Sequence, residues 1–233
     1  MKKKYITIIL VLVFIFMFTT CTAGKSRSTS NKAPPLVCLG NSLTAGHGAD
    51  IPGVDNKEKS YPAFLQNKIN IPVINAGVSG NTTAQGLSRV KDEVLSKNPQ
   101  IVIIELGAND LFQGISLSTT QDNLQNIINM INNGNRKIYL AKFYSQEMVR
   151  TMLAMLQING YDEQTELINQ YDTMFNTLAN SNHVQLIDDI WAGLSEIHMS
   201  DNMHPNANGY KIMADNYFNA LEPYLQENGL LKQ

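Results

Sequence analysis

Residues 101–110 read IVIIELGAND, and this stretch gives the strongest indication of fold class in the chain. Its first four residues are all β-branched and no polar residue interrupts them, which is typical of a strand buried on both faces. A strand with one face in water would alternate apolar and polar side chains. Residues 107–110 (GAND) follow at once. We therefore expect a buried strand at Ile101–Leu106 that opens into a polar loop.

Four further runs have the same near-continuous apolar character and are predicted to be strands: Leu36–Leu39, Val73–Asn75, Lys137–Lys142 and Val184–Ile187. Helical periodicity occupies the stretches around 60–69, 84–96, 120–133, 146–158, 163–180 and 206–226. This alternation predicts an α/β fold, a three-layer α/β/α sandwich around a mostly parallel five-stranded sheet. Because no repeat and no second linker follow residue 35, residues 36–233 are predicted to form one domain.

Glycine-containing polar loops follow three of the predicted strands. They are Gly40-Asn41-Ser42, residues 76–81 (AGVSGN) and residues 107–110 (GAND). The carboxyl ends of parallel strands meet at one edge of a sheet, and ligands bind beyond that edge. We therefore expect the three loops to form one site with exposed backbone amide groups.

The composition excludes several classes of function. The chain has 233 residues, 43% of them hydrophobic and 16% charged, and its formal net charge is −2. These values indicate a globular protein, because disordered chains are more charged and less apolar. A mildly acidic chain lacks the basic face that nucleic-acid binding requires. Two cysteines cannot supply a disulfide framework or a four-thiolate zinc site.

The N-terminal residues 1–20 have the pattern of a secretory signal peptide. Three lysines precede the mostly apolar run Ile6–Phe18, and small residues follow it. The run is shorter than the roughly 20 residues that a membrane-spanning helix needs. We therefore expect export of the protein, with an uncleaved anchor as the alternative.

The end of this leader resembles the lipobox of bacterial lipoproteins, in which a cysteine becomes the lipidated first residue. Cys21 takes that place, although Phe18 and Thr20 stand where Leu and a small residue are usual. Residues 21–35 are polar and end in two prolines, as expected of a flexible tether. The sequence thus predicts a lipid anchor on Cys21 at the cell envelope; the alternative is cleavage near Ala23 and free secretion.

Two polar residues far apart in the chain are candidates for nucleophilic catalysis. Ser42 lies at a strand-to-helix turn, where it either caps the helix or acts as a nucleophile beside a base. The candidate base is His204, because Asp201 is close enough to accept a hydrogen bond from its ring and fix the tautomer. Pro205 is expected to rigidify the turn and to begin the last helix.

Acyl transfer also needs hydrogen-bond donors for the developing oxyanion. The backbone N–H groups of Ser42 and Gly80 and the side-chain amide of Asn109 are the candidates, with ordinary turn residues as the alternative at the last two positions. The three other histidines are expected to be structural or solvated: His47, His183 and His198.

Four blocks of this sequence together resemble the SGNH (GDSL-type) hydrolases. The blocks are LGNSLTAG (39–46), NAGVSGNTTAQGLSRV (75–90), IELGANDLF (104–112) and DNMHPN (201–206). The resemblance extends over about residues 36–223 and is greatest to the thioesterase I, lysophospholipase and arylesterase branch. It implies a flavodoxin-like fold, and it implies that Ser42, Gly80, Asn109 and His204 are the signature residues.

The resemblance also implies a mechanism. Ser42 attacks an ester or thioester carbonyl, His204 takes its proton, and Asp201 completes the triad. Ser42, Gly80 and Asn109 form the oxyanion hole, and no metal or organic cofactor is implied. The substrate would be a small acyl ester or a lipid such as a lysophospholipid. Oxygen esters fit an exported protein better than acyl-CoA, which is an intracellular thioester.

The chain departs from the family pattern in two places. Asn41 replaces the Asp of the GDSL motif, which removes a charge beside the nucleophile. Residues 145–160 (SQEMVRTMLAMLQING) lengthen the connection between the fourth and fifth strands, and their Met and Leu residues recur at helical spacing. This apolar face either packs on the core or forms a lid over the acyl chain.

Three rival functions are weighed against the hydrolase. A carbohydrate O-acetylesterase of the same fold is the main enzymatic alternative, and a non-catalytic surface binding protein is the alternative from another class. A phosphoryl-transfer enzyme is disfavoured, since the chain has no G-x-x-x-x-G-K-[ST] element. We expect Glu105, Asp188 and Asp189 to be structural or solvated, and Trp191, Met199 and Met203 to lie near the pocket.

Overall fold

The structure is a computed structural model that describes residues 33–144 and 160–232. The predicted signal peptide (1–20), Cys21 with most of the tether, and residues 145–159 of the lengthened connection lie outside the described residues.

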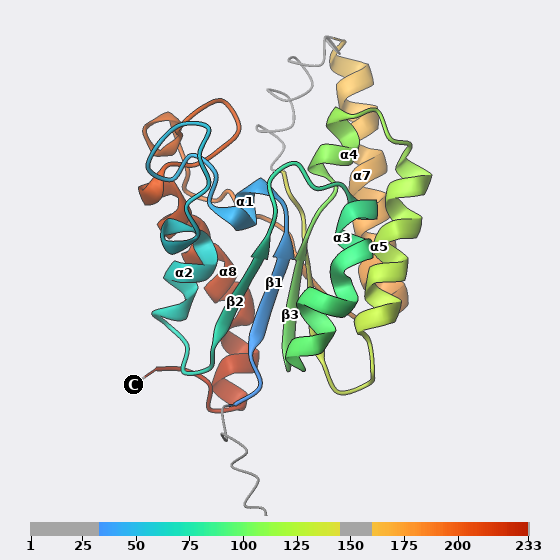
Figure 1. The fold of residues 1–233 in the computed structure, drawn as a ribbon. Coiled ribbons are helices and arrows are strands. Elements are labelled where there is room, and N and C mark those ends of the chain that lie inside the picture. Colours follow the sequence, from blue (N-terminus) through green and yellow to red (C-terminus); the bar gives the residue numbers. More distant parts are fainter. Residues whose placement is uncertain (1–32, 145–159, 233) are drawn as a thin grey trace, which may run out of the picture. The chain divides into compact units, whose positions relative to one another are not determined.

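Five parallel strands form the central sheet, as the sequence predicts (Figure 1). Their order in the sheet is β2-β1-β3-β4-β5, and Leu36 of β1 pairs with Val73 of β2 and Ile101 of β3. Every residue of β1 and β3 is buried, which explains why their sequences are continuously apolar. The strand bounds are β1 Leu36–Gly40, β2 Val73–Gly77, β3 Ile101–Glu105, β4 Lys137–Ala141 and β5 Gln185–Ile187.

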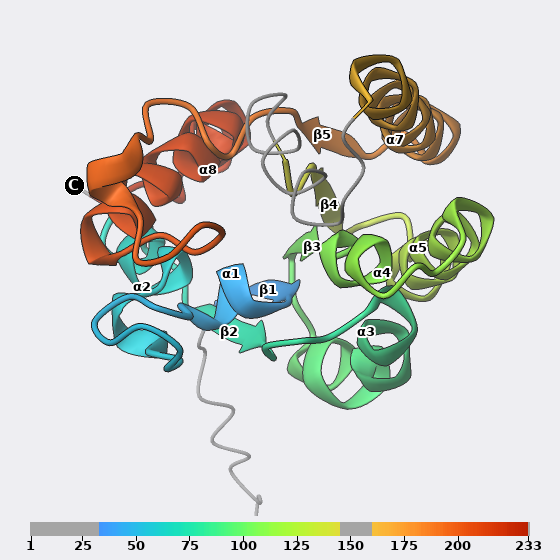
Figure 2. The same ribbon diagram turned by 90° about the horizontal axis from the view of Figure 1, so that it is seen from above.

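Helices cover both faces of the sheet and make the predicted three layers. One face carries α2 and α8, and the other carries α3, α5 and α7 (Figure 2). The α-helices are α1 Ser42–Ala45, α2 Tyr61–Gln66, α3 Thr83–Arg89, α4 Ala108–Phe112, α5 Leu117–Ile131, α7 Tyr161–Asn182 and α8 Ala207–Glu227. Shorter turns are η1 Lys57–Lys59, the π-helical η2 Val90–Val94, η3 Leu95–Lys97 and η4 Glu196–His198.

Three local predictions need correction. The single helix expected over 84–96 is divided, because α3 ends at Arg89 and a π turn follows that brings both Val90 and Val94 into the core. Helix α4 occupies part of what the sequence indicated only as a polar loop. Pro205 does not begin α8; Asn206 is its N-cap, and its side chain accepts hydrogen bonds from two backbone N–H groups of the first turn.

Alternate residues of the strands point to opposite faces and build two apolar clusters. Val37 and Val102 pack toward α5 and α7, whereas Leu36 and Ile101 pack toward α2 and α8. Cys38 is buried in the second cluster, and burial raises the pKa of its thiol far above the usual value, so this thiol is chemically inert. Within the described ranges, no helix is long and apolar enough to cross a membrane.

Candidate active site

Ser42 is the first residue of α1 and follows β1 at the carboxyl edge of the sheet. Asn41, not Ser42, caps this helix, because its Oδ1 accepts the N–H of Leu43 at 2.9 Å. The capping alternative for Ser42 is therefore wrong, and the Ser42 hydroxyl is available for other contacts. Gly46 ends α1 in the left-handed region (φ 76°), so the turn is very short.

Helix α1 rests directly on the ends of β1 and β2. A Cβ atom added to Gly77 would overlap the backbone nitrogen of Ala45, and one added to Gly40 would overlap the side chain of Thr44. Asn75 of β2 also holds α1 against the sheet, because its Nδ2 donates to the carbonyl oxygen of Thr44 at 2.7 Å. This close approach holds the Ser42 turn in one position relative to the sheet.

A buried acid lies beneath the Ser42 turn. Glu105 ends β3 with no exposed surface, and its carboxylate accepts hydrogen bonds from Asn41 Nδ2 at 3.0 Å and Thr44 Oγ1 at 2.9 Å. Burial raises the pKa of Glu105 to about 8, although these donors act in the opposite direction. Asn41 thus supplies a donor where an Asp would place a second carboxyl group beside Glu105. The expectation of a structural role for Glu105 agrees with this packing.

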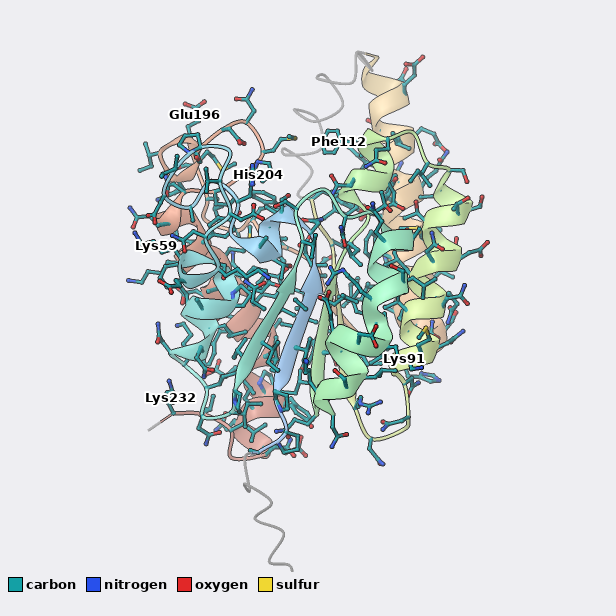
Figure 3. All side chains as sticks on the ribbon, in the orientation of Figure 1. Lys59, Lys91, Phe112, Glu196, His204 and Lys232 are labelled. Carbon is teal, nitrogen blue, oxygen red and sulfur yellow. The ribbon has the colours of Figure 1, made fainter. Side chains whose placement is uncertain are left out.

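His204 connects Ser42 with Asp201. Its Nε2 lies 3.0 Å from Ser42 Oγ, and its Nδ1 lies 2.9 Å from Oδ2 and 3.0 Å from Oδ1 of Asp201. Asp201 Oδ1 also accepts the backbone N–H groups of Met203 at 2.8 Å and of His204 at 2.7 Å. The structure therefore brings the three predicted catalytic residues together in one hydrogen-bonded line, with His204 on the loop before α8 (Figure 3).

The pKa shifts of His204 and Asp201 suit a histidine that acts as a base at neutral pH. Burial lowers the pKa of His204 below its usual value and outweighs the raising effect of Asp201, and His47 lowers it further. Burial alone would raise the pKa of Asp201, but the N–H of Met203 and the ring of His204 outweigh burial and lower it. The consequence is a neutral imidazole beside a carboxylate.

The predicted oxyanion-hole residues border the same cavity as Ser42. Gly80 has φ 80°, a conformation that favours glycine, and it lines the cavity. Asn109, in α4, donates one amide hydrogen to the carbonyl oxygen of Asn81 at 2.9 Å. This bond fixes the Asn109 amide and leaves its second hydrogen for a ligand.

Arg89 is a supporting residue that the sequence did not single out. Its guanidinium donates to the carbonyl oxygens of Gly40 at 2.7 Å and Ala76 at 2.6 Å, and to Asn81 Oδ1 at 2.8 Å. It therefore ties the ends of β1 and β2 to the loop that carries Gly80. No pattern in the sequence signals this role, because an arginine at the end of a helix is usually exposed.

The cavity beside Ser42 measures about 180 Å³ and has a largely apolar wall. Trp191 forms part of this wall, and its Nε1 donates to the carbonyl oxygen of Phe143 at 3.0 Å. Phe112 reaches over the edge of the sheet from α4, opposite His204 (Figure 3). Met203 lines the cavity as predicted, whereas Met199 does not. The apolar lining residues are Leu43, Ala108, Phe112, Phe143, Trp191 and Met203.

His47 is the main departure from the predicted site. It was expected to be structural or solvated, but its ring lines the cavity with its centroid 4.5 Å from that of His204. Its Nδ1 lies 2.6 Å from Asp55 Oδ1, to which Ser79 Oγ also donates at 2.6 Å. A lone histidine in a glycine-rich loop carries no sequence signal for such a cluster.

The remaining histidines lie outside the cavity. His183 ends α7 in the left-handed region, and His198 accepts a hydrogen bond from the backbone N–H of Ser195 at 3.1 Å. Asp188 pairs with Lys142, and Asp189 accepts the backbone N–H of Trp191 at 2.8 Å. These contacts agree with the structural roles expected for all four residues.

The described ranges contain no cluster of three or more His, Cys, Asp or Glu residues that could hold a metal ion. Asp110, the acid of the third loop, is buried and accepts the backbone N–H of Thr83 at 2.8 Å as well as its hydroxyl. It therefore fixes the start of α3 against α4.

Comparison with known proteins gives a consistent picture. The sequence profile of the GDSL-like Lipase/Acylhydrolase family matches residues 38–212. An arylesterase of Vibrio mimicus is 32% identical over 120 residues, which are 49% of this chain and 57% of that protein. The thioesterase 1/protease 1/lysophospholipase L1 of Escherichia coli strain K12 is 31% identical over 112 residues, 47% of this chain and 51% of that protein. The chain thus spans just over half the length of these two relatives.

The fold also resembles that of solved structures. A crystal structure of TesA matches with a TM-score of 0.65 and 21% identity, over 81% of this chain and 98% of that one. At this identity the likeness concerns the fold alone.

Proposed function

The chain belongs to the GDSL-like lipase/acylhydrolase family, and from this premise we propose that it is a serine esterase acting through an acyl-enzyme. One observation carries the proposal: Ser42 Oγ lies 3.0 Å from His204 Nε2, and His204 Nδ1 lies 2.9 Å from Asp201. A serine hydroxyl is a weak nucleophile unless a base is within hydrogen-bond reach and is itself oriented by a third group. These distances support that arrangement.

In the proposed acylation step, Ser42 Oγ bonds to the carbonyl carbon while its proton moves to His204 Nε2. The lowered pKa of His204 supports this role, because only the neutral ring can take the proton. The carbonyl oxygen becomes an oxyanion that the N–H groups of Ser42 and Gly80 and the free amide hydrogen of Asn109 would bind. The ester C–O bond then breaks, and the departing alcohol takes the proton from His204.

In the proposed deacylation step, His204 removes a proton from water, and the hydroxide attacks the acyl carbon held on Ser42. The same donors hold the second oxyanion. Its collapse breaks the bond to Ser42 Oγ, which recovers its proton from His204, and the carboxylic acid leaves. Asp201 keeps the His204 ring in the required tautomer throughout, with Nδ1 protonated.

The cavity supports oxygen esters of short acids as the substrate. Its volume is about 180 Å³, whereas pockets for drug-sized ligands measure about 300–1,000 Å³. Its apolar wall suits a hydrocarbon acyl group of a few carbons. The same small volume favours the second candidate, a carbohydrate O-acetylesterase, whose acyl group has only two carbons.

The first experiment compares p-nitrophenyl esters from acetyl to palmitoyl with the purified full chain and with Ser42→Ala. We expect the wild type to hydrolyse the short esters fastest, and the variant to lose several orders of magnitude in kcat. Ser88→Ala is the matched control, because Ser88 is exposed on α3 and away from the cavity. A folded wild type that is as inactive as Ser42→Ala would support the non-catalytic binding protein instead.

We also propose that the protein is exported and anchored to the cell envelope by lipid on Cys21. The basic start, the apolar run Ile6–Phe18 and the polar stretch 21–35 support this. Mass spectrometry of the mature N-terminus tests it: we expect a diacylglyceryl-modified Cys21. An unmodified peptide that begins after Cys21 would contradict the lipid anchor and support free secretion.

A further inference from the structure

A second imidazole–carboxylate pair places its histidine, His47, against the cavity. His47 Nδ1 is 2.6 Å from Asp55 Oδ1, and Ser79 Oγ donates to the same oxygen at 2.6 Å. The His47 ring meets the His204 ring edge to face, with 61° between the two planes. His47, Ser79 and His204 all line the cavity that contains Ser42.

The backbone holds His47 firmly in this place. His47 and Asp55 form an antiparallel β-bridge, so that both ends of their loop are fixed to each other. The hydroxyl of Tyr210, from α8, donates to the carbonyl oxygen of His47 at 2.8 Å. Next along the chain, Gly48 packs so closely on Ser200 that an added Cβ would lie 2.9 Å from the Ser200 Cβ. His47 is therefore oriented before any substrate arrives, which lowers the entropy lost on binding.

The position of His47 relative to the reacting atoms indicates which part of a substrate it meets. The oxyanion must point to Gly80 and Asn109, and the acyl chain has the apolar wall of the cavity. The departing oxygen must lie near His204 Nε2, because this nitrogen gives it a proton. Since the His47 ring lies against the His204 ring, it borders the alcohol side of the ester.

We propose that His47, oriented by Asp55, binds the departing alcohol and selects alcohols that carry a hydroxyl next to the ester oxygen. The inference rests on the proposed esterase function. Asp55 engages His47 Nδ1, and no hydrogen-bond partner for Nε2 occurs within residues 33–144 and 160–232. A hydroxyl can either donate to a neutral Nε2 or accept from a protonated one, so it fits both states of the ring.

The charges around His47 favour a neutral polyol, such as a glycerol or sugar ester, over a phosphate-bearing alcohol. Each imidazole at the cavity already has a carboxylate partner, Asp55 for His47 and Asp201 for His204. Of the two lysines between His47 and Ser60, Lys59 is paired with Asp50, and Lys57 Nζ donates to the carbonyl oxygen of Asn75 at 3.4 Å. Within residues 33–144 and 160–232, no lysine or arginine lines the cavity, so no such charge there would offset the cost of desolvating an anion.

The test compares two esters of the same acid with the full chain: glyceryl monobutyrate, whose alcohol has neighbouring hydroxyls, and propyl butyrate, whose alcohol has none. The measured quantity is the ratio of their kcat/KM values, in which the steps common to both substrates cancel. We expect the wild type to prefer the glyceryl ester by about five- to tenfold, which lies within the range for one hydrogen bond.

Three variants locate the source of that preference. His47→Phe keeps an aromatic ring against His204 but has no donor or acceptor, and we expect its ratio to fall to about one. His47→Gln retains a polar group and should keep part of the preference. His183→Asn is the control, because His183 is remote from the cavity and asparagine tolerates its left-handed backbone (φ 52°).

Several results would overturn the inference. One is a wild type without preference for the glyceryl ester, and another is a His47→Phe variant with an unchanged ratio. A higher kcat/KM for 1-butyryl-glycerol 3-phosphate than for glyceryl monobutyrate would overturn the assignment to a neutral alcohol. Labelling with p-nitrophenyl ethylphosphonate separates this from failure of the proposed function: if Ser42 is not phosphonylated in the wild type, the esterase proposal fails and this inference fails with it.

Discussion

Two histidine–aspartate pairs border one cavity in this protein, and they differ in what their second ring nitrogen reaches. In both pairs Nδ1 contacts a carboxylate, at 2.9 Å in His204–Asp201 and 2.6 Å in His47–Asp55. Of the two, only His204 places Nε2 within 3.0 Å of Ser42 Oγ. A histidine–aspartate contact therefore does not by itself identify a general base, and the distance to the nucleophile decides between the pairs.

The two pairs are also built differently. Asp201 stands three residues before His204 and accepts two backbone N–H groups of its own turn, so the pair is a local structure. Asp55 stands eight residues after His47 and reaches it across a β-bridge, with the Ser79 hydroxyl as its other donor. The first pair forms within one turn of chain, whereas the second requires a loop to close.

The largest expected difference between the pairs comes from removing each histidine. His204→Ala should lower kcat for p-nitrophenyl acetate by about 10⁴-fold or more, because Ser42 loses its base. His47→Ala should lower kcat/KM for glyceryl monobutyrate by about tenfold, because it loses a contact to the alcohol. Steady-state kinetics with both substrates measures the two losses. Similar losses of kcat in both variants would show that the comparison is wrong.

Removing the carboxylate charges should give a smaller but parallel difference. Asp201→Asn should lower kcat by about 10³- to 10⁴-fold, because an amide in this place favours the wrong tautomer of His204. Asp55→Asn should cost less than tenfold, because the amide oxygen can still accept from His47 Nδ1. Circular dichroism of each variant controls for folding. Equal effects of the two substitutions on kcat would contradict the distinct roles.

The pH dependence of kcat/KM tests whether the two pairs are coupled, because the charges of His47 and Asp55 change the pKa of His204. His204 must be neutral to act, and burial lowers its pKa, so the acidic limb of the profile should have its midpoint below pH 6.5. Asp55 raises the pKa of His204, so Asp55→Asn should move the midpoint to lower pH. His47 lowers that pKa, so His47→Phe should move it to higher pH. Shifts in the opposite directions would refute this coupling.

The smallest expected effect concerns Glu105, an acid of the site without a histidine partner. Burial raises its pKa from 4.5 to about 8, so between these values the folded chain holds a proton that the unfolded chain has released. The stability contributed by Glu105 is therefore complete below pH 4.5 and is lost as the pH rises to about 8. In the Glu105→Gln variant, Tm should therefore fall less than in the wild type as the pH rises from 4.5 to about 8.

Calorimetry at the two ends of the window measures this difference. Glu227→Gln is the control, because Glu227 is exposed at the end of α8. A difference in Tm between wild type and Glu105→Gln that does not change with pH would show that Glu105 ionises as readily in the folded chain as in the unfolded one.

The sequence by itself determined the sheet and the three candidate catalytic residues. A strand buried on both faces must be continuously apolar, so β1, β3 and β4 could be located from their apolar runs, to within a few residues at their ends. The edge strands β2 and β5 are only partly buried, but short apolar runs marked them as well. The contact between Asp201 and His204 could be inferred because three residues of one turn place the two side chains together. The position of Ser42 after the first strand left a helix cap open, and the resemblance of the motif around it to the SGNH hydrolases identified it as the candidate nucleophile.

The tertiary structure decided which residues surround Ser42, His204 and Asp201. The order β2-β1-β3 brings Glu105 under Asn41, and the docking of α8 holds His47 beside His204. The Arg89 contacts to the ends of β1 and β2 arise in the same way. Such contacts join residues far apart in the chain, and their formation depends on how whole elements pack. Local spacing carries no information on that packing, which is why His47 reads as an ordinary loop residue until the fold is known.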